Sequence, residues 1–159
     1  LFRGLMPKLV IVGLVTNAAY NGSLGTNPFE FNHHKITSIA LYREGVNIVG
    51  KPYEMNFASN QIVREYLALF QNLGMYNSEQ TMGLSLDEFK SGSTLFAFNC
   101  TPDLAIGNGH SQPYKDGNLR LVCNFSTNTT ASLNVIVMAI FDGQLEIDSH
   151  RNVFVDYKT

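Results

Sequence analysis

Charged side chains are scarce in this sequence of 159 residues. Asp, Glu, Lys and Arg make up 15% of the chain, whereas about 25% is usual for a soluble domain. The formal net charge is −2, and no basic run occurs that would follow a nucleic-acid backbone. The sequence therefore argues against specific recognition of DNA or RNA. Its low charge also suggests that partners cover much of the surface.

Cysteines are few, and long apolar runs are absent. Cys100 and Cys123 are too few for a disulfide framework, and both lie in strand-like apolar runs where free thiols are common. No apolar run approaches the roughly 20 residues that a membrane-spanning helix needs. The chain begins at Leu1 without the features of a secretory signal. We therefore expect a piece of a longer chain, with no membrane-spanning segment.

Short apolar runs separated by turn residues dominate the sequence and indicate an all-β fold. The dipeptides Glu44-Gly45, Asp116-Gly117 and Asp142-Gly143 are typical of tight turns, and the last one joins two runs directly, as a hairpin turn does. Such short links favour antiparallel pairing. About eight strands are predicted, at Leu9–Val15, Ile36–Tyr42, Val46–Val49, Thr94–Phe98, Leu119–Phe125, Leu133–Phe141, Leu145–Ile147 and Val153–Tyr157.

A helix is predicted over about residues 59–74, within a long insertion in the strand pattern. Apolar residues repeat there at helical spacing. Ser59 is placed to cap the first turn, and Gly74 is placed to end the last one. The insertion therefore interrupts the β pattern with at least one amphipathic helix.

A second, shorter helix is predicted over about residues 86–91 of the same insertion. Ser85 and Glu88 have the spacing of a capping box, in which each side chain binds the backbone N–H of the other residue. Phe89 provides one apolar anchor. This segment is therefore expected to form a single capped turn that packs through one aromatic ring.

Two predicted strands are apolar on both faces. An antiparallel sheet with one wet face should alternate apolar and polar residues. In the run Leu133–Phe141 only Asn134 is polar near the centre, and Leu9–Val15 shows the same feature, whereas Leu119–Phe125 alternates. We therefore expect the outer face of the two-faced strands to be covered by the 59–74 helix, by another domain or by another subunit.

No pattern in the sequence assembles a catalytic site. A Gly-x-Ser-x-Gly nucleophile elbow does not occur. Jelly-roll oxygenases hold iron with a His followed two residues later by a carboxylate. None of the four histidines has that neighbour, namely His33, His34, His110 and His150. We therefore predict that the chain is not an enzyme, with no catalytic residues and no cofactor.

Asp142, Glu146 and Asp148 are calcium candidates, because Glu146 and Asp148 share a strand face and carboxylate oxygens suit calcium. The plainer interpretation places Asp142 at a hairpin tip and the other two on a solvated strand face. The favoured prediction is therefore that no metal binds. A β-sandwich that binds glycans or calcium through Tyr42, Tyr53 or this acidic group stays as an alternative function.

Seven short phrases occur in a consistent order along nearly the whole chain. They are Asn27–His33, Ile39–Gly45, Thr94–Phe98, Thr101–Leu104, Gly117–Leu121, Phe141–Asp148 and Arg151–Val153. Each phrase alone is short, but their succession is specific. Together they resemble the C-terminal region of the major capsid protein of Polinton (Maverick) elements and adintoviruses, including relatives scattered through animal genomes.

The resemblance implies a double-jelly-roll capsid protein, of which this chain is mainly the second barrel. The expected fold is then an all-β, antiparallel, eight-stranded jelly-roll sandwich forming one domain over residues 1–159. The resemblance supplies no catalytic, cofactor or metal residues. It also explains the two-faced strands, whose outer sides would pack against the first barrel or neighbouring subunits.

The partners that the resemblance implies are further copies of the protein. Three complete copies would form a pseudo-hexagonal capsomer of an icosahedral shell around double-stranded DNA, next to other capsomers and to minor capsid or penton proteins. The expected location is the virion capsid, assembled inside the host cell. A domesticated genomic copy that no longer builds particles is the remaining alternative.

Overall fold

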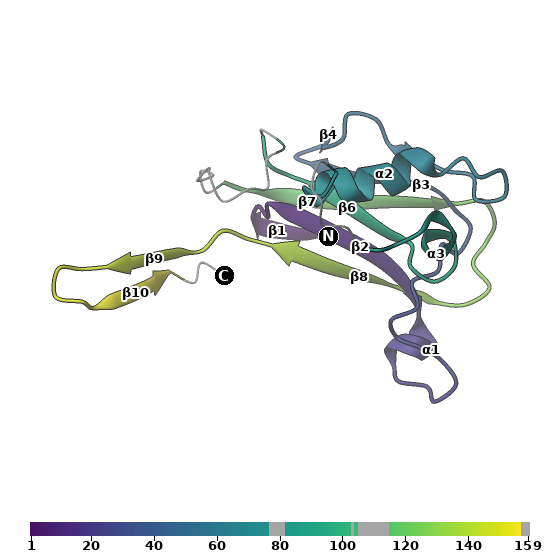
Figure 1. Ribbon diagram of the computed structural model, residues 1–159, viewed down its shortest axis with the longest axis horizontal. Coiled ribbons are helices and arrows are strands. Elements are labelled where there is room, and N and C mark those ends of the chain that lie inside the picture. Colours follow the sequence, from purple (N-terminus) through teal and green to yellow (C-terminus); the bar gives the residue numbers. More distant parts are fainter. Residues whose placement is uncertain (77–81, 103, 105–114, 157–159) are drawn as a thin grey trace.

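The computed structural model describes residues 1–76, 82–102, 104 and 115–156 (Figure 1). Within them the fold is mostly β, and every pair of named strands is antiparallel. The strands are β1 (Phe2–Leu5), β2 (Leu9–Thr16), β3 (Ile36–Arg43), β4 (Val46–Asn47), β5 (Tyr53–Glu54), β6 (Leu95–Asn99), β7 (Asp116–Phe125), β8 (Leu133–Ile140), β9 (Gln144–Ile147) and β10 (Val153–Asp156). The helices are α1 (Asn17–Tyr20), α2 (Val63–Asn72) and α3 (Leu86–Lys90).

Two sheets share one hydrophobic core. The first has the order β1-β7-β3-β4, with β5 also paired to β3, and the second has the order β6-β2-β8. Val10 and Val12 of β2 and Ile39 and Leu41 of β3 are fully buried in the same apolar cluster. Strands β9 and β10 pair with each other and, among the described residues, with no other strand, so they form a separate hairpin.

All eight predicted apolar runs contain strands, while β1 and β5 were not predicted. The sequence of β1 is short and includes Gly4, so its pattern is weak. Its pairing partner is the start of β7, where Leu5 lies opposite Asp116 and Gly4 lies opposite Gly117. The predicted turn at Asp116-Gly117 is therefore wrong, because β1 holds this dipeptide in the sheet.

The two predicted hairpin turns have opposite outcomes. Glu44-Gly45 joins β3 to β4, and both residues have positive φ angles (50° and 81°), as a two-residue hairpin turn requires. The prediction at Asp142-Gly143 is wrong, because β8 pairs with β2 while β9 pairs with β10. Neither Asp142 nor Gly143 has the positive φ angle that Glu44 and Gly45 show, and β8 and β9 are not paired.

Helix α2 lies inside the predicted range but begins later. Its N-cap position is Ile62, with no side-chain cap, so the prediction that Ser59 caps it is wrong. The backbone N–H of Ser59 instead donates to Asn56 Oδ1 in a preceding turn. Gly74 ends the helix as predicted, with a φ angle of 72° and its N–H bonded to the carbonyl of Gln71.

Helix α3 agrees with its prediction. Ser85 is its N-cap, and the reciprocal hydrogen bonds with Glu88 form a capping box. Phe89 is completely buried and contacts Phe96 edge-on, with ring centroids 6.4 Å apart. None of the helices in the described part of the chain is long and apolar enough to cross a membrane.

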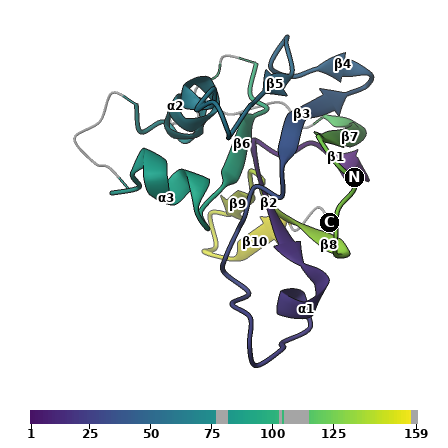
Figure 2. The same cartoon turned by 90° about the vertical axis from the view of Figure 1, so that its right-hand side faces the viewer.

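Helix α2 covers β6, while the short helix α1 contacts β8. Helix α2 packs along β6, and α3 contacts α2 (Figure 2). Both faces of β2 are buried, since Val10 and Val12 on one face and Leu9 and Val15 on the other are at most 2% exposed. The prediction of two-sided burial is therefore confirmed for β2. For β8 it is not confirmed, since three of its apolar side chains are exposed.

Candidate assembly surface

Three apolar side chains of β8 are exposed. Met138 is 58% exposed, Val135 45% and Ile140 39%. The strand pairs with β2 along its whole length, from Leu133 to Ile140, but only on one side. Its other edge has no strand partner among the described residues. This strand therefore presents both an unpaired backbone edge and exposed apolar side chains.

The hairpin β9–β10, here called the arm, projects away from the two sheets (Figure 1). Residues directly opposite each other in a hairpin have side chains on the same face. Leu145 pairs with Val155 and Ile147 pairs with Val153, so these four side chains form one apolar face. They are between 43% and 64% exposed, and Phe154 on the other face is 58% exposed.

Polar contacts define both ends of the arm. At its base, Lys8 Nζ lies 2.6 Å from Asp142 Oδ1, and the backbone N–H of Lys8 donates to the carbonyl of Ile140. At its tip, Asp148 accepts hydrogen bonds from the Asn152 side chain and from the backbone N–H groups of Asn152 and His150. These bonds hold the pKa of Asp148 below its usual value. The arm is thus a formed hairpin with a fixed base.

The structure does not bring the calcium candidates together. Asp142 lies at the base of the arm beside Lys8, and Glu146 lies on β9. The Asp148 carboxylate accepts a hydrogen bond from the Asn152 side chain at the tip of the arm. In the described part of the chain, no group of three or more His, Cys, Asp and Glu side chains is placed to hold a metal ion.

The two tyrosines of the glycan alternative are engaged within the chain. The guanidinium of Arg120 lies 4.9 Å from the ring centre of Tyr42. Tyr53 is buried, and its hydroxyl accepts a hydrogen bond from Asn72 Nδ2. Burial raises the pKa of Tyr53. Tyr53 therefore offers no open face on which a sugar would stack, and Arg120 lies over the Tyr42 ring.

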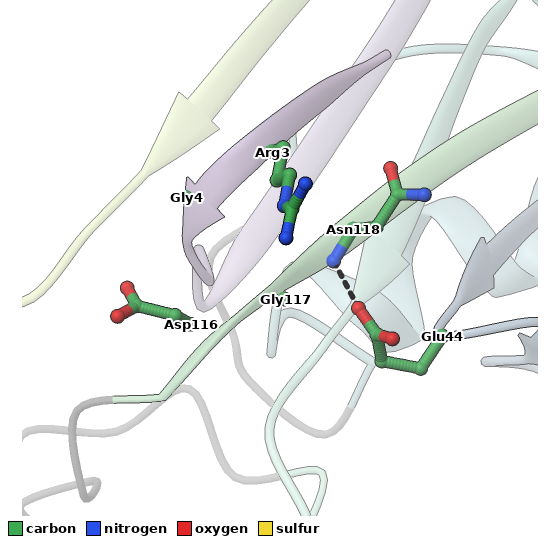
Figure 3. A pocket seen from close by; sticks show the side chains of 6 residues that line it. All are labelled: Arg3, Gly4, Glu44, Asp116, Gly117 and Asn118. Atoms are coloured by element: carbon green, nitrogen blue, oxygen red, sulfur yellow. Dashed lines mark hydrogen bonds between the residues drawn. The ribbon is translucent and has the colours of Figure 1, made fainter.

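A hollow of about 660 Å³ lies beside the β1–β7 pair and is lined by polar groups (Figure 3). Its lining residues are Arg3, Gly4, Glu44, Asp116, Gly117 and Asn118. The Glu44 carboxylate accepts a hydrogen bond from the backbone N–H of Asn118, and the Glu44 N–H donates to the Asn118 carbonyl. Glu44 therefore fastens the β3–β4 turn to β7, which is a structural role.

The described residues include His33 and two cysteines as possible bases and nucleophiles. His33 stacks on Phe57 at 4.0 Å, and burial lowers the pKa of His33. Cys100 and Cys123 are free thiols, and burial raises the pKa of Cys100 to about 11. A thiol that stays protonated near neutral pH is a poor nucleophile. His110 lies outside the described residues.

The comparisons with known proteins are sparse. No protein-family model matches the chain, and no solved structure matches it. The chain is 33% identical over 159 residues to "Uncharacterized protein F54H12.2" of Caenorhabditis elegans. The match covers 98% of this chain and 38% of that protein. The chain is therefore similar to a part, well under half, of a longer C. elegans protein.

Proposed function

We propose that this chain is a jelly-roll building block of a virus-type protein shell, and that its function is self-association. The observation on which this rests most heavily is the apolar surface formed by β8 and the arm. Monomeric soluble proteins rarely expose contiguous apolar patches beyond a few hundred Å². Removing such a surface from water supplies the free energy of association, and repetition across a lattice multiplies weak contacts.

The pairing of the strands supports the jelly-roll interpretation. Strand β2 pairs with β8, and β3 pairs with β7, in different sheets. Early strands thus pair with late strands in nested order, which is expected when a long antiparallel ribbon rolls into two facing sheets. The eight predicted strands include both of these pairs. The strands β1 and β5 extend the first sheet.

The wider assembly is proposed from the sequence resemblance. In it a second jelly-roll domain accompanies this one, and three complete chains form a pseudo-hexagonal capsomer of an icosahedral shell around double-stranded DNA. Other capsomers and minor capsid or penton proteins are the further partners, and the virion capsid is the location. The greater length of the C. elegans relative leaves room for a second domain of this kind. The proposal gives the chain no enzymatic, cofactor or metal role.

The direct test is assembly of the complete protein. We expect light scattering to give the mass of three chains and negative-stain images to show hexagonal capsomers or shells. A protein that stays monomeric at high concentration, without particles, would contradict the proposal and favour a domesticated copy. Calorimetric titration with calcium and with a sugar panel is the parallel measurement, and saturable binding of either would favour the ligand-binding alternative.

A further inference from the structure

We infer that the arm is an exchange element, which leaves its own chain and adds to the open edge of β8 in a second copy of this chain. This exchange rests on the proposed self-association, and its contact is between the arm of one copy and β8 of another. Added strands of this kind gain affinity from backbone hydrogen bonds and specificity from alternate side chains. The donor, the acceptor and the reason for choosing a second copy follow from separate observations.

The arm has the properties of a donor. Within the described residues it has no strand partner other than its own two strands. An isolated two-stranded hairpin is marginally stable in water. Its four-residue face of Leu145, Ile147, Val153 and Val155 is apolar and at least 43% exposed. Pairing along β8 would place this face beside the β8 side chains, where cross-strand contacts would partly cover it and stabilise the hairpin.

Strand β8 has the properties of an acceptor. Natural edge strands are usually protected by charged side chains, proline, bulges or a covering loop. The sequence of β8, L-N-V-I-V-M-A-I, contains neither a charged residue nor proline, and its pairing with β2 shows no bulge. Its eight residues are long enough for a four-residue strand of the arm to pair fully.

The arm is not placed to reach its own β8. Only Phe141, Asp142 and Gly143 separate β8 from β9, and a return beside β8 would need a tight reversal there. Neither Asp142 nor Gly143 has the positive φ angle of such a turn, and Lys8 holds the Asp142 carboxylate at the end of β8. The arm consequently points away from its own sheet (Figure 1).

The exposed apolar side chains suffice for a contact between copies. Met138 and Ile140 lie on one face of β8, and Leu145, Ile147, Val153 and Val155 lie on one face of the arm. At roughly 100 Å² each, these six present on the order of 600 Å², at the lower end of what one partner buries in a specific interface. Donor and acceptor are different patches of the same chain, so the contact is heterologous and closes into a ring when the rotation permits.

Cysteine cross-linking between copies tests the inference. One preparation of the chain carries Met138→Cys and another carries Ile147→Cys, and the two are mixed under mild oxidation. We expect a disulfide between the two variants to form at least tenfold faster than between Val46→Cys and Ile147→Cys. Val46 is the control because it is 71% exposed on β4, in the other sheet. Cross-linking no faster than this control would overturn the exchange.

A double variant and a mass measurement separate the possible failures. If the chain with both Met138→Cys and Ile147→Cys forms the disulfide within one monomer, the arm folds back and the inference is wrong. We also expect Leu145→Asn with Val155→Asn to weaken self-association at least tenfold, while Val46→Asn changes it less than about twofold. If Leu145→Asn with Val155→Asn self-associates as strongly as wild type, the exchange of the arm is wrong but the proposed self-association still stands. A wild-type chain that never self-associates contradicts the proposed function as well.

Discussion

Gly13 lies in the middle of β2, where no side chain fits. A Cβ atom there would lie 2.5 Å from Phe31 Cδ1 and 2.9 Å from Leu95 Cδ2. The backbone of Phe31 is fixed by hydrogen bonds to Gly92 and Thr94, so its ring cannot easily move away. Because Gly13 has no side chain, the ring of Phe31 can pack against β2. This contact holds the loop before β3 against the second sheet.

Replacing this glycine should cost stability. We expect Gly13→Ala to lower the free energy of unfolding by about 1–3 kcal/mol, the usual range for overpacking a core. Gly25→Ala is the matched control, because no atom lies within 4 Å of a Cβ built there, and it should stay within about 0.5 kcal/mol of wild type. Urea denaturation measures both. Equal effects of the two substitutions would show that the Phe31 contact is loose.

The burial of Glu65 predicts that the stability of the fold depends on pH. The residue is 3% exposed, its Oε1 atom has no hydrogen-bond partner, and burial raises its pKa above the ordinary 4.5. Between 4.5 and the raised value the folded state holds more protons than the unfolded state, so stability falls as pH rises through this window. We expect Glu65→Gln to be more stable than wild type at pH 7, by about 1 kcal/mol.

The same substitution should have no benefit in acid. Below pH 4 the carboxyl group is protonated in both states, so wild type and Glu65→Gln should unfold at the same urea concentration. Urea titrations at several pH values measure the difference. A gain that is constant from pH 3 to pH 8 would mean that ionisation of Glu65 is not its cause.

Local sequence signals predicted some residue roles and missed others. The capping box at Ser85 and Glu88 was predicted because both partners lie within one helical turn. The fit of Gly13 against Phe31 was not predictable, because the two residues meet only after the loop has folded onto the sheet. The calcium candidates failed to cluster for a similar reason, since the position of Asp142 depends on distant Lys8.

At the scale of elements, the start of α3 and the start of α2 form a natural comparison. Ser85 caps α3 through its side chain, whereas Ser59 precedes α2 without capping it. We expect Ser85→Ala to lower the free energy of unfolding by about 1 kcal/mol and Ser59→Ala to change it by less than half of that. Chemical denaturation measures both effects. NMR titration should also show the pKa of Glu88 rising toward its ordinary value in Ser85→Ala, because its bonds with Ser85 hold it low.

The positions of elements were easier to predict than their partners. Hydrophobic periodicity is local, and all eight predicted runs contain strands. Pairing is not local. A turn dipeptide placed β9 beside β8, but β8 and β9 are not paired, and β9 pairs with β10. The arm could have been suspected from its composition, because apolar residues alternate in β9 and are consecutive in β10.

At the scale of the whole molecule, the two-faced apolar strands were the most informative sequence feature. They predicted that cover was needed, and the structure shows β2 buried on both faces, whereas β8 packs Val137 against the core and keeps three apolar side chains exposed. A single sequence can show that a strand is apolar on both faces, because successive side chains of a strand point to opposite faces. It does not identify the covering partner, which is a property of the assembly.

A protein whose interfaces form only on association should be more stable when concentrated. Partners that bind the folded state stabilise it by mass action, and a hundredfold rise in concentration adds up to about 2.7 kcal/mol. For a domain of this size, that corresponds to a thermal midpoint about 5–10 °C higher. We expect this rise for the wild-type chain between roughly 1 and 100 µM, followed by circular dichroism. It should be largely absent in Leu145→Asn with Val155→Asn, whose midpoint at the lowest concentration should equal that of wild type, because both side chains are exposed in the single chain. A midpoint that does not change with wild-type concentration would indicate that the single chain is the final state and that the apolar arm serves another purpose.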